Sequence, residues 1–127
     1  MIAIADSTVI FHLRYHQAKM RQIMMALDIT ELLITRISYL ELLSGASENA
    51  KLDTRKTLSP FTVLEFDKKA ADIGNTLAMK YRVGAKSSKD FLIACIAIAN
   101  KLPLLTENDK DFPYRRLRLL PYRISDY

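Results

Sequence analysis

The stretch SSKDFLIACIAIANKLPLLTENDKDF, residues 87–112, decides the fold that we expect for this chain. Its uninterrupted apolar run, Phe91 to Ala99, is too long for an ordinary strand and is rich in alanine. The run predicts a helix over Lys89 to Lys101 that is buried on nearly all sides. Ser87 and Asp90 have the spacing of a capping box at its start. A buried element thus presents a carboxylate at its end.

The same stretch continues into a second apolar segment. Pro103, Leu104 and Leu105 read as a short buried strand that ends at Thr106, and a polar cluster at residues 107–111 follows directly. A helix that leads into a short strand with a polar exit is the second half of a βαβ unit. Functional groups of such units collect outside the carboxyl ends of the strands.

The beginning of the chain supplies the first half of that unit. Ile2 to Ala5 form a short apolar run that stops at Asp6, and Ser7 and Thr8 suit a sharp turn from strand to helix. Apolar residues then keep helical spacing as far as Leu27. We expect one broken helix or two short ones there.

A second strand is predicted at Leu32 to Thr35. Ser38 and Glu41 after it form a capping box, which places Glu41 one turn into a helix that follows a strand. Gly45 interrupts this helix early.

The remaining segments repeat the alternation of helix and strand. Ala50 to Leu58 predicts a helix and Phe61 to Phe66 a strand, and Asp67 caps a further helix that Gly84 closes. The tail, residues 114–127, alternates leucine with arginine and suggests a final edge strand. This order predicts an α/β protein, a three-layer α/β/α sandwich with a mainly parallel sheet of four or five strands.

Composition limits the class of protein. A chain of 127 residues fits one domain, residues 1–127, and its single cysteine, Cys95, excludes an internal disulfide. The N-terminus lacks a basic targeting region, and the longest apolar run is far shorter than the roughly 20 residues of a membrane span. We therefore expect a cytoplasmic protein that does not use a membrane.

Three acids occupy similar positions in the predicted fold. Asp6, Glu41 and Asp90 each lie near the start of a predicted helix, where a single acid has an ordinary role as a cap. A parallel sheet would bring these ends towards one cleft, where several carboxylates repel one another unless a cation neutralises them. Oxygen ligands without a second cysteine indicate Mg²⁺ or Mn²⁺. His12 and His16 are four residues apart, but without an HExxH pattern they are better explained as a polar helix face.

The charge balance favours a polyanionic partner. Nineteen basic residues against fourteen acidic ones give a net charge of +5, which suits a nucleic acid or an acidic protein. A carboxylate-held metal near a basic surface suits hydrolysis of phosphodiester bonds, whereas P-loop and acyl-transfer motifs are missing. One basic cluster could contact RNA and stack bases, or could protect an edge strand from aggregation; it consists of Tyr114, Arg115, Arg116, Arg118, Tyr122 and Arg123.

These motifs in this order resemble the PIN-domain ribonucleases, and especially the VapC toxins of toxin–antitoxin pairs. The resemblance rests on ADSTVI at residues 5–10, SYLELLSGA at 38–46, KDFLIACIAIANKLPLLTEND at 89–109 and the closing Phe112. It implies an α/β/α fold, a Mg²⁺-dependent endoribonuclease (Mn²⁺ is also suitable), a cleft with four acids, a homodimer, and an antitoxin that blocks the cleft.

The resemblance also implies roles for individual residues. Asp6, Glu41 and Asp90 match the first three acids, with Asp6 and Asp90 binding the metal and Glu41 helping to position it or the attacking water. Where many members carry a fourth acid, this chain has Asn108, and we predict that Asp111 supplies the charge instead. Thr8, Thr106 and Asn108 are the candidates for contact with substrate or water, and Thr8 stands where asparagine is frequent.

Two other interpretations remain at this point. Asn108 in place of an acid motivates a metal-free PIN-like binding module. A flavodoxin-like phosphoacceptor receiver has similar length and layers, but it requires an acid pair at the first strand end and an aspartate at a middle one. Here those positions hold the lone Asp6 and Thr35.

We also expect a homodimer. The helix at Phe91 to Ala99, together with Met20, Met24 and Met25, offers apolar surface that one thin domain would not cover.

Overall fold

The computed structural model describes residues 1–127, and it contains five strands and six α-helices in alternation. The elements are β1 (Ile2–Ala5), α1 (Ser7–Tyr15), α2 (Gln17–Ala26), β2 (Glu31–Thr35), α3 (Arg36–Gly45), α4 (Lys51–Leu58), β3 (Val63–Leu64), α5 (Lys68–Ala78), α6 (Ser88–Ala99), β4 (Leu104–Thr106) and β5 (Leu119–Pro121). Single 3₁₀ turns lie at Glu48–Ala50, Ala85–Ser87, Asp109–Asp111 and Ile124–Asp126.

All five strands are parallel, in the order β3-β2-β1-β4-β5. The central strand β1 pairs with β2 through Ala3 and Leu32, and with β4 through Ala5 and Leu105. The expected parallel α/β sheet is therefore confirmed. The flavodoxin-like alternative is wrong, because that fold has the strand order 2-1-3-4-5.

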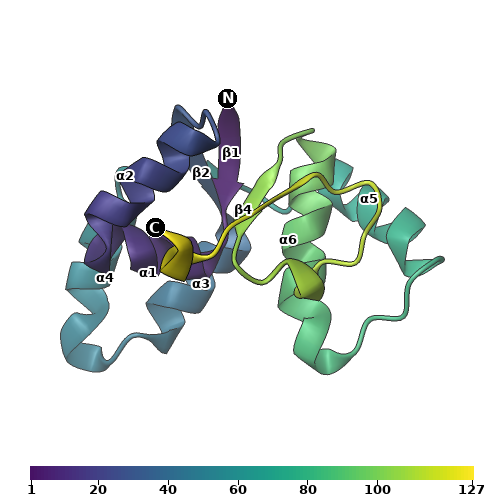
Figure 1. The fold of residues 1–127 in the computed structure, drawn as a ribbon. Helices are drawn as coiled ribbons and strands as arrows, with labels where there is room; N and C mark the ends of the chain where they lie inside the picture. The colour runs from purple at the N-terminus through teal and green to yellow at the C-terminus, as the bar shows by residue number, and fades with distance from the viewer.

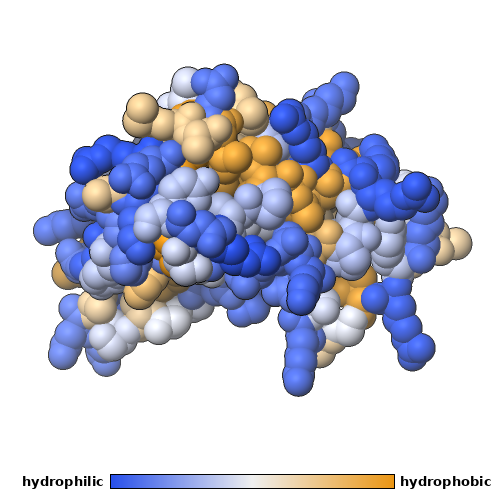
Figure 2. All heavy atoms as spheres, viewed as in Figure 1, coloured by the Kyte–Doolittle hydropathy of each residue, from blue (hydrophilic) through white to orange (hydrophobic).

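Helices cover both faces of the sheet, which gives the three expected layers (Figure 1). Side chains alternate along β1, so that Ala3 and Ala5 join the core beneath α1, α2 and α4, whereas Ile4 joins the core beneath α5 and α6. Figure 2 shows a mostly hydrophilic surface in the same view, with hydrophobic side chains gathered near its centre. No helix in this structure is long and apolar enough to cross a bilayer.

Helix α6 is buried as the sequence predicts. Residues 93–98 are all buried, and α5 approaches so closely that a Cβ atom on Gly74 would lie 3.5 Å from the sulfur of Cys95. Met20 is also completely buried. These residues are covered within the chain itself, so they cannot supply the expected dimer contact, whereas Met25, which the sequence analysis also named, is 81% exposed.

Helix α3 begins earlier than its predicted capping box. Its cap is Thr35, the last residue of β2, whose hydroxyl oxygen accepts a hydrogen bond of 3.1 Å from the backbone N–H of Ser38. The strand thus passes into the helix without a loop, and the cap falls three residues before the predicted one. Glu41 consequently lies in the second turn of α3.

Ser87 precedes α6 as predicted but does not cap it with its side chain, and the predicted end of α5 at Gly84 is wrong. The side chain of Ser87 makes no capping hydrogen bond, and α6 begins directly after a 3₁₀ turn. Helix α5 ends at Ala78, where the carbonyl of Leu77 accepts two hydrogen bonds, so that Gly84 lies beyond its end with a φ of −83°. Strand β3 is also shorter than predicted, at Val63–Leu64.

Candidate functional site

The carboxyl ends of β1 and β4 lie side by side and form the centre of the candidate site. Asp6 follows the last residue of β1, caps α1 with its backbone, and is only 5% exposed. The backbone N–H of Asp6 donates to the carbonyl of Leu105, and the hydroxyl of Thr106 donates to Asp6 Oδ2 at 2.7 Å. The sheet register therefore fixes the position of the Asp6 carboxylate.

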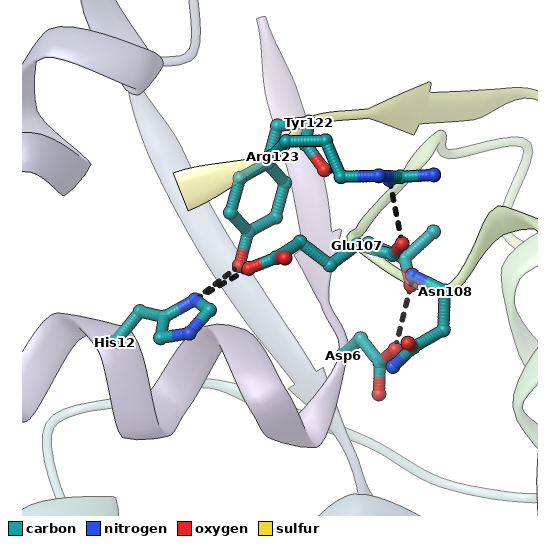
Figure 3. Close-up of polar contacts among 7 residues, drawn as sticks. Asp6, His12, Glu107, Asn108, Tyr122 and Arg123 are labelled. Carbon is teal, nitrogen blue, oxygen red and sulfur yellow. Dashed lines mark hydrogen bonds and ion pairs between the residues drawn. The ribbon is translucent and has the colours of Figure 1, made fainter. Parts of the chain in front are cut away.

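Thr106 is held in turn by the loop that follows it. The backbone N–H of Asn108 donates to Thr106 Oγ1 at 2.9 Å, so the hydroxyl accepts one hydrogen bond and donates the other (Figure 3). This arrangement fixes the direction of the hydroxyl proton towards Asp6. The sequence analysis considered Thr106 only as a contact for substrate or water and missed this link.

Asp90 is the acid whose protonation is most affected by the others. It is the third residue of α6 and is partly buried. The pKa of Asp90 is raised to about 6, first by burial and then by the negative charges of Asp6, Asp111 and Glu41, while Lys89 opposes them with the smallest effect. The four predicted acids therefore lie near enough to repel one another.

The carboxylate of Glu41 forms an ion pair with Lys89. Lys89 Nζ lies 2.7 Å from Glu41 Oε2, and the contact raises the pKa of Lys89. The pair joins α3 to the start of α6. The sequence analysis missed this contact, although a lysine next to Asp90 was a visible signal.

The two candidates for the fourth acid position, Asn108 and Asp111, are both exposed residues of the loop after β4. Asp111 is the last residue of the 3₁₀ turn Asp109–Asp111. Its backbone N–H donates to the carbonyl of Asn108 at 2.9 Å. Thr8 lies in the first turn of α1 and is partly buried.

The donor set fits a divalent cation of the magnesium type. Carboxylate oxygens from β1, α6 and the loop repel one another through the charges that act on Asp90, and a cation would remove that repulsion. Asp6 and Asp90 are the residues that would hold it. No three His, Cys, Asp or Glu side chains are arranged so that they could hold a metal ion together.

The interpretation of His12 as part of an exposed polar helix face is wrong, because His12 is buried against Tyr122.

The aromatic residues of the tail do not form a surface for bases. Tyr114 and Tyr122 are each only 5% exposed, so the predicted stacking on RNA bases is wrong for both. Arg123 is bound to Asp109, whereas the exposed Arg116 forms no ion pair. Strand β5 forms the sheet edge beside β4, which agrees with the edge-strand interpretation.

Comparison with known proteins identifies the architecture. The family model of the PIN domain matches residues 3–116 of this chain. VapBC2 from Rickettsia felis, solved bound to a DNA fragment from its promoter, is similar with a TM-score of 0.75 and 20% identity over 97% of this chain and 100% of that one. A toxin–antitoxin complex from Klebsiella pneumoniae has a TM-score of 0.73 and 24% identity over 95% and 98%. DNA-bound VapBC from Salmonella typhimurium has a TM-score of 0.71 and 26% identity over 95% and 98%. No curated protein matches this chain in a sequence comparison.

The raised pKa of Asp90 predicts how stability depends on pH in the metal-free protein. The folded state binds this proton more tightly than the unfolded state, from an ordinary pKa of 3.8 to about 6, so stability falls as pH rises through that window. The full shift corresponds to about 3 kcal/mol, which solvent screening reduces. We expect Asp90→Asn to stabilise the protein by about 1–2 kcal/mol at pH 8 and to have little effect at pH 4.

Denaturant unfolding in EDTA at pH 4, 6 and 8 measures this difference. Asp72→Asn is the matched control, because Asp72 lies on the exposed face of α5 in a surface pair with Lys68. Such a pair contributes about 0.5 kcal/mol or less at any of these pH values. An Asp90→Asn protein that is less stable than the wild type at pH 8 would contradict the prediction.

Proposed function

Because the chain belongs to the PIN domain family, we propose that it is a cytoplasmic, metal-dependent endoribonuclease, the toxin of a toxin–antitoxin pair. The observation that carries this proposal is the raised pKa of Asp90, to which burial and the charges of Asp6, Asp111 and Glu41 all contribute. Repulsion of this kind is costly in a purely structural site and useful in one that binds a cation. We propose that residues 1–127 form a single PIN-like domain.

We assign the metal to Asp6 and Asp90, with Mg²⁺ as the resident ion and Mn²⁺ as a substitute. When bound, such an ion supplies an acidified water and stabilises charge on the phosphate. Thr106 keeps the Asp6 carboxylate in one orientation through its 2.7 Å hydrogen bond. Glu41 would orient the metal or the attacking water, and its carboxylate pairs with Lys89 in this structure.

RNA as the substrate is supported by the charge around this edge. A groove of about 690 Å³ beside Glu41 is lined by Lys51 and Lys89 as well as by apolar residues of α3 and α6. Two ammonium groups next to a carboxylate cluster suit a phosphate backbone that runs past the metal site. The net charge of +5 acts in the same direction.

An antitoxin partner is supported by the toxin–antitoxin complexes to which the chain is similar. A second groove, of about 420 Å³, lies between α1, α3 and α4 and also reaches Glu41. Phe11 and Tyr15, which line it, are both more than half exposed. An antitoxin segment with apolar side chains would cover these rings and block access to the acids.

A metal-free PIN-like binding module is the second candidate. Two observations favour it: Asn108 stands where many relatives carry an acid, and no three candidate ligands are preassembled. The two candidates differ in metal binding. Titration of the wild-type protein with Mn²⁺ separates them, because the binding module would show no saturable site that Asp90→Asn removes.

We also propose a homodimer, which must use surfaces other than the buried α6. Met25 and Leu52 are 81% and 72% exposed in the α1–α4 layer, and Met79 at the end of α5 is 88% exposed. The hydrophobic area in Figure 2 adds to this apolar surface. We expect light scattering at micromolar concentration to give twice the mass of the chain. A monomer under those conditions would contradict the proposal.

The assignment of the metal ligands predicts the effect of two substitutions. Asp6→Asn and Asp90→Asn each remove a ligand, so each should abolish RNA cleavage while the fold is retained. Cleavage of a labelled RNA by the purified variants and their circular dichroism test this together. Asp72→Asn again serves as the control and should cleave normally. Full cleavage by Asp90→Asn would disprove the assignment.

The fourth position yields a separate prediction. A carboxylate both binds and neutralises the ion, whereas an amide can only hydrogen-bond a bound water. We therefore expect Asp111→Asn to weaken Mn²⁺ binding and cleavage together, and Asn108→Asp to be tolerated or to tighten the metal. Calorimetric titration and cleavage assays measure both effects. If Asp111→Asn is silent while Asn108→Ala is inactive, the site contains three acids and an amide.

A further inference from the structure

The loop that follows β4 carries the fourth position of the site but has little regular structure of its own. Its only internal order is one 3₁₀ turn, in which the N–H of Asp111 donates to Asn108 and the N–H of Phe112 donates to Asp109. Glu41 and Asp90, in contrast, lie in helices, and Asp6 joins β1 directly to α1, so the core determines the positions of all three. Something outside the loop must fix it if Asp111 is to have a defined position.

Arg123 makes two of the contacts that fix the loop. Its Nη1 atom donates to the backbone carbonyl of Glu107 at 2.6 Å (Figure 3). Its Nη2 atom donates to Asp109 Oδ1 at 2.9 Å. Next to it, the backbone N–H of Tyr122 donates to the carbonyl of Thr106 at 3.1 Å. Two consecutive residues of the tail therefore bind the end of β4 at Thr106 and two residues of the loop, Glu107 and Asp109.

The side chain of Tyr122 adds a buried anchor on the other side of Glu107. Tyr122 Oη lies 2.7 Å from Nδ1 of His12, and the same nitrogen lies 3.4 Å from Glu107 Oε2. His12 and Tyr122 are both buried, at the interface of α1 with the sheet. Glu107 is thus held through its carbonyl by Arg123, and its carboxylate lies beside the His12–Tyr122 pair, as Figure 3 shows.

We propose that Tyr122 and Arg123 clamp the loop of residues 107–111, and that Arg123 is a positioning residue that sets the place of Asp111 in the acid cluster. The proposal rests on the proposed function in so far as Asp111 serves the metal. Arg123 acts at a distance, because it touches Glu107 and Asp109 and not the acids themselves. The planar guanidinium reaches both acceptors at once, which the single ammonium of a lysine cannot do.

A competing explanation is that Arg123 only contributes positive charge towards RNA. Its side chain is 44% exposed, so charge alone would be available to a substrate. Arg123→Lys separates the two explanations, because it keeps the charge and loses the two-point contact. Partly exposed pairs contribute little to global stability, so this variant should fold.

The test compares Arg123→Lys with Arg116→Ala in the full chain. Arg116 is exposed, belongs to the same tail and forms no ion pair, so its removal controls for charge. We expect Arg123→Lys to weaken Mn²⁺ binding by about 10- to 100-fold, the usual effect of losing a group that orients a ligand. Arg116→Ala should bind Mn²⁺ like the wild type.

A double substitution shows whether Arg123 works through Asp111. If it does, Arg123→Lys combined with Asp111→Asn should bind Mn²⁺ no more weakly than Asp111→Asn alone. Additive losses would overturn the proposal, as would an Arg123→Lys protein with wild-type Mn²⁺ affinity. Tyr122→Phe is the second variant, because it removes only the hydroxyl that binds His12 and should weaken Mn²⁺ binding in the same way.

Amide hydrogen exchange in the metal-free protein keeps this proposal distinct from the proposed function. The amides of Asp111 and Phe112 should exchange faster in Arg123→Lys than in Arg116→Ala or the wild type. A wild-type protein that binds Mn²⁺ without cleaving RNA would count against the ribonuclease and leave the clamp standing. Unchanged exchange of both amides in Arg123→Lys would refute the clamp, whatever the protein cleaves.

Discussion

The repulsion among carboxylates at the carboxyl ends of β1 and β4 is the constraint on which the rest of this structure depends. A parallel sheet necessarily brings its strand ends to one edge, and here that edge receives acids from a strand end, two helices and a loop. The cost appears in Asp90, whose pKa rises to about 6 through burial and through the charges of its neighbours. The buried α6 and the paired strands must hold these groups together against that cost.

The negative charges of the acids are not balanced equally by neighbouring groups. Asp6 receives a hydrogen bond from Thr106, and Glu41 receives the ammonium group of Lys89. Asp90 has no such partner, and the favourable effect of Lys89 is the smallest of the influences on its pKa. The uncompensated negative charge is thus concentrated at Asp90, which is where a cation would gain most.

The sequence was informative where apolar patterns decide the structure. The run at Phe91 to Ala99 and the short apolar segments before Asp6 and Thr106 predicted α6, β1 and β4, because burial of such runs is enforced by the hydrophobic effect. The convergence of the acids then followed from the geometry of a parallel sheet. Helix ends were less predictable, since Thr35 at the strand end competed successfully with Ser38 for the cap of α3.

Contacts between distant residues could not be predicted in this way. His12 and Tyr122 lie 110 residues apart in the sequence, and nothing in either local pattern indicates that they share a hydrogen bond. The tail appeared to be an exposed basic strand, yet Tyr114 and Tyr122 are buried because β5 adds to the sheet beside β4 and carries them into both cores. The pair formed by Lys89 and Glu41 likewise depends on the packing of α3 beside α6.

The site is consequently held by two kinds of force. Asp6, Glu41 and Asp90 are placed by elements that pack through apolar contacts, which change little with salt or with the charge of nearby groups. The loop that carries Asp111 is placed by polar contacts, and its ion pair between Arg123 and Asp109 is partly exposed, at 44% and 35%. Screening by salt weakens such a pair, whereas it leaves a hydrophobic core intact. The fourth position is therefore the adjustable part of an otherwise rigid cluster, and the tail that holds it belongs functionally to the site.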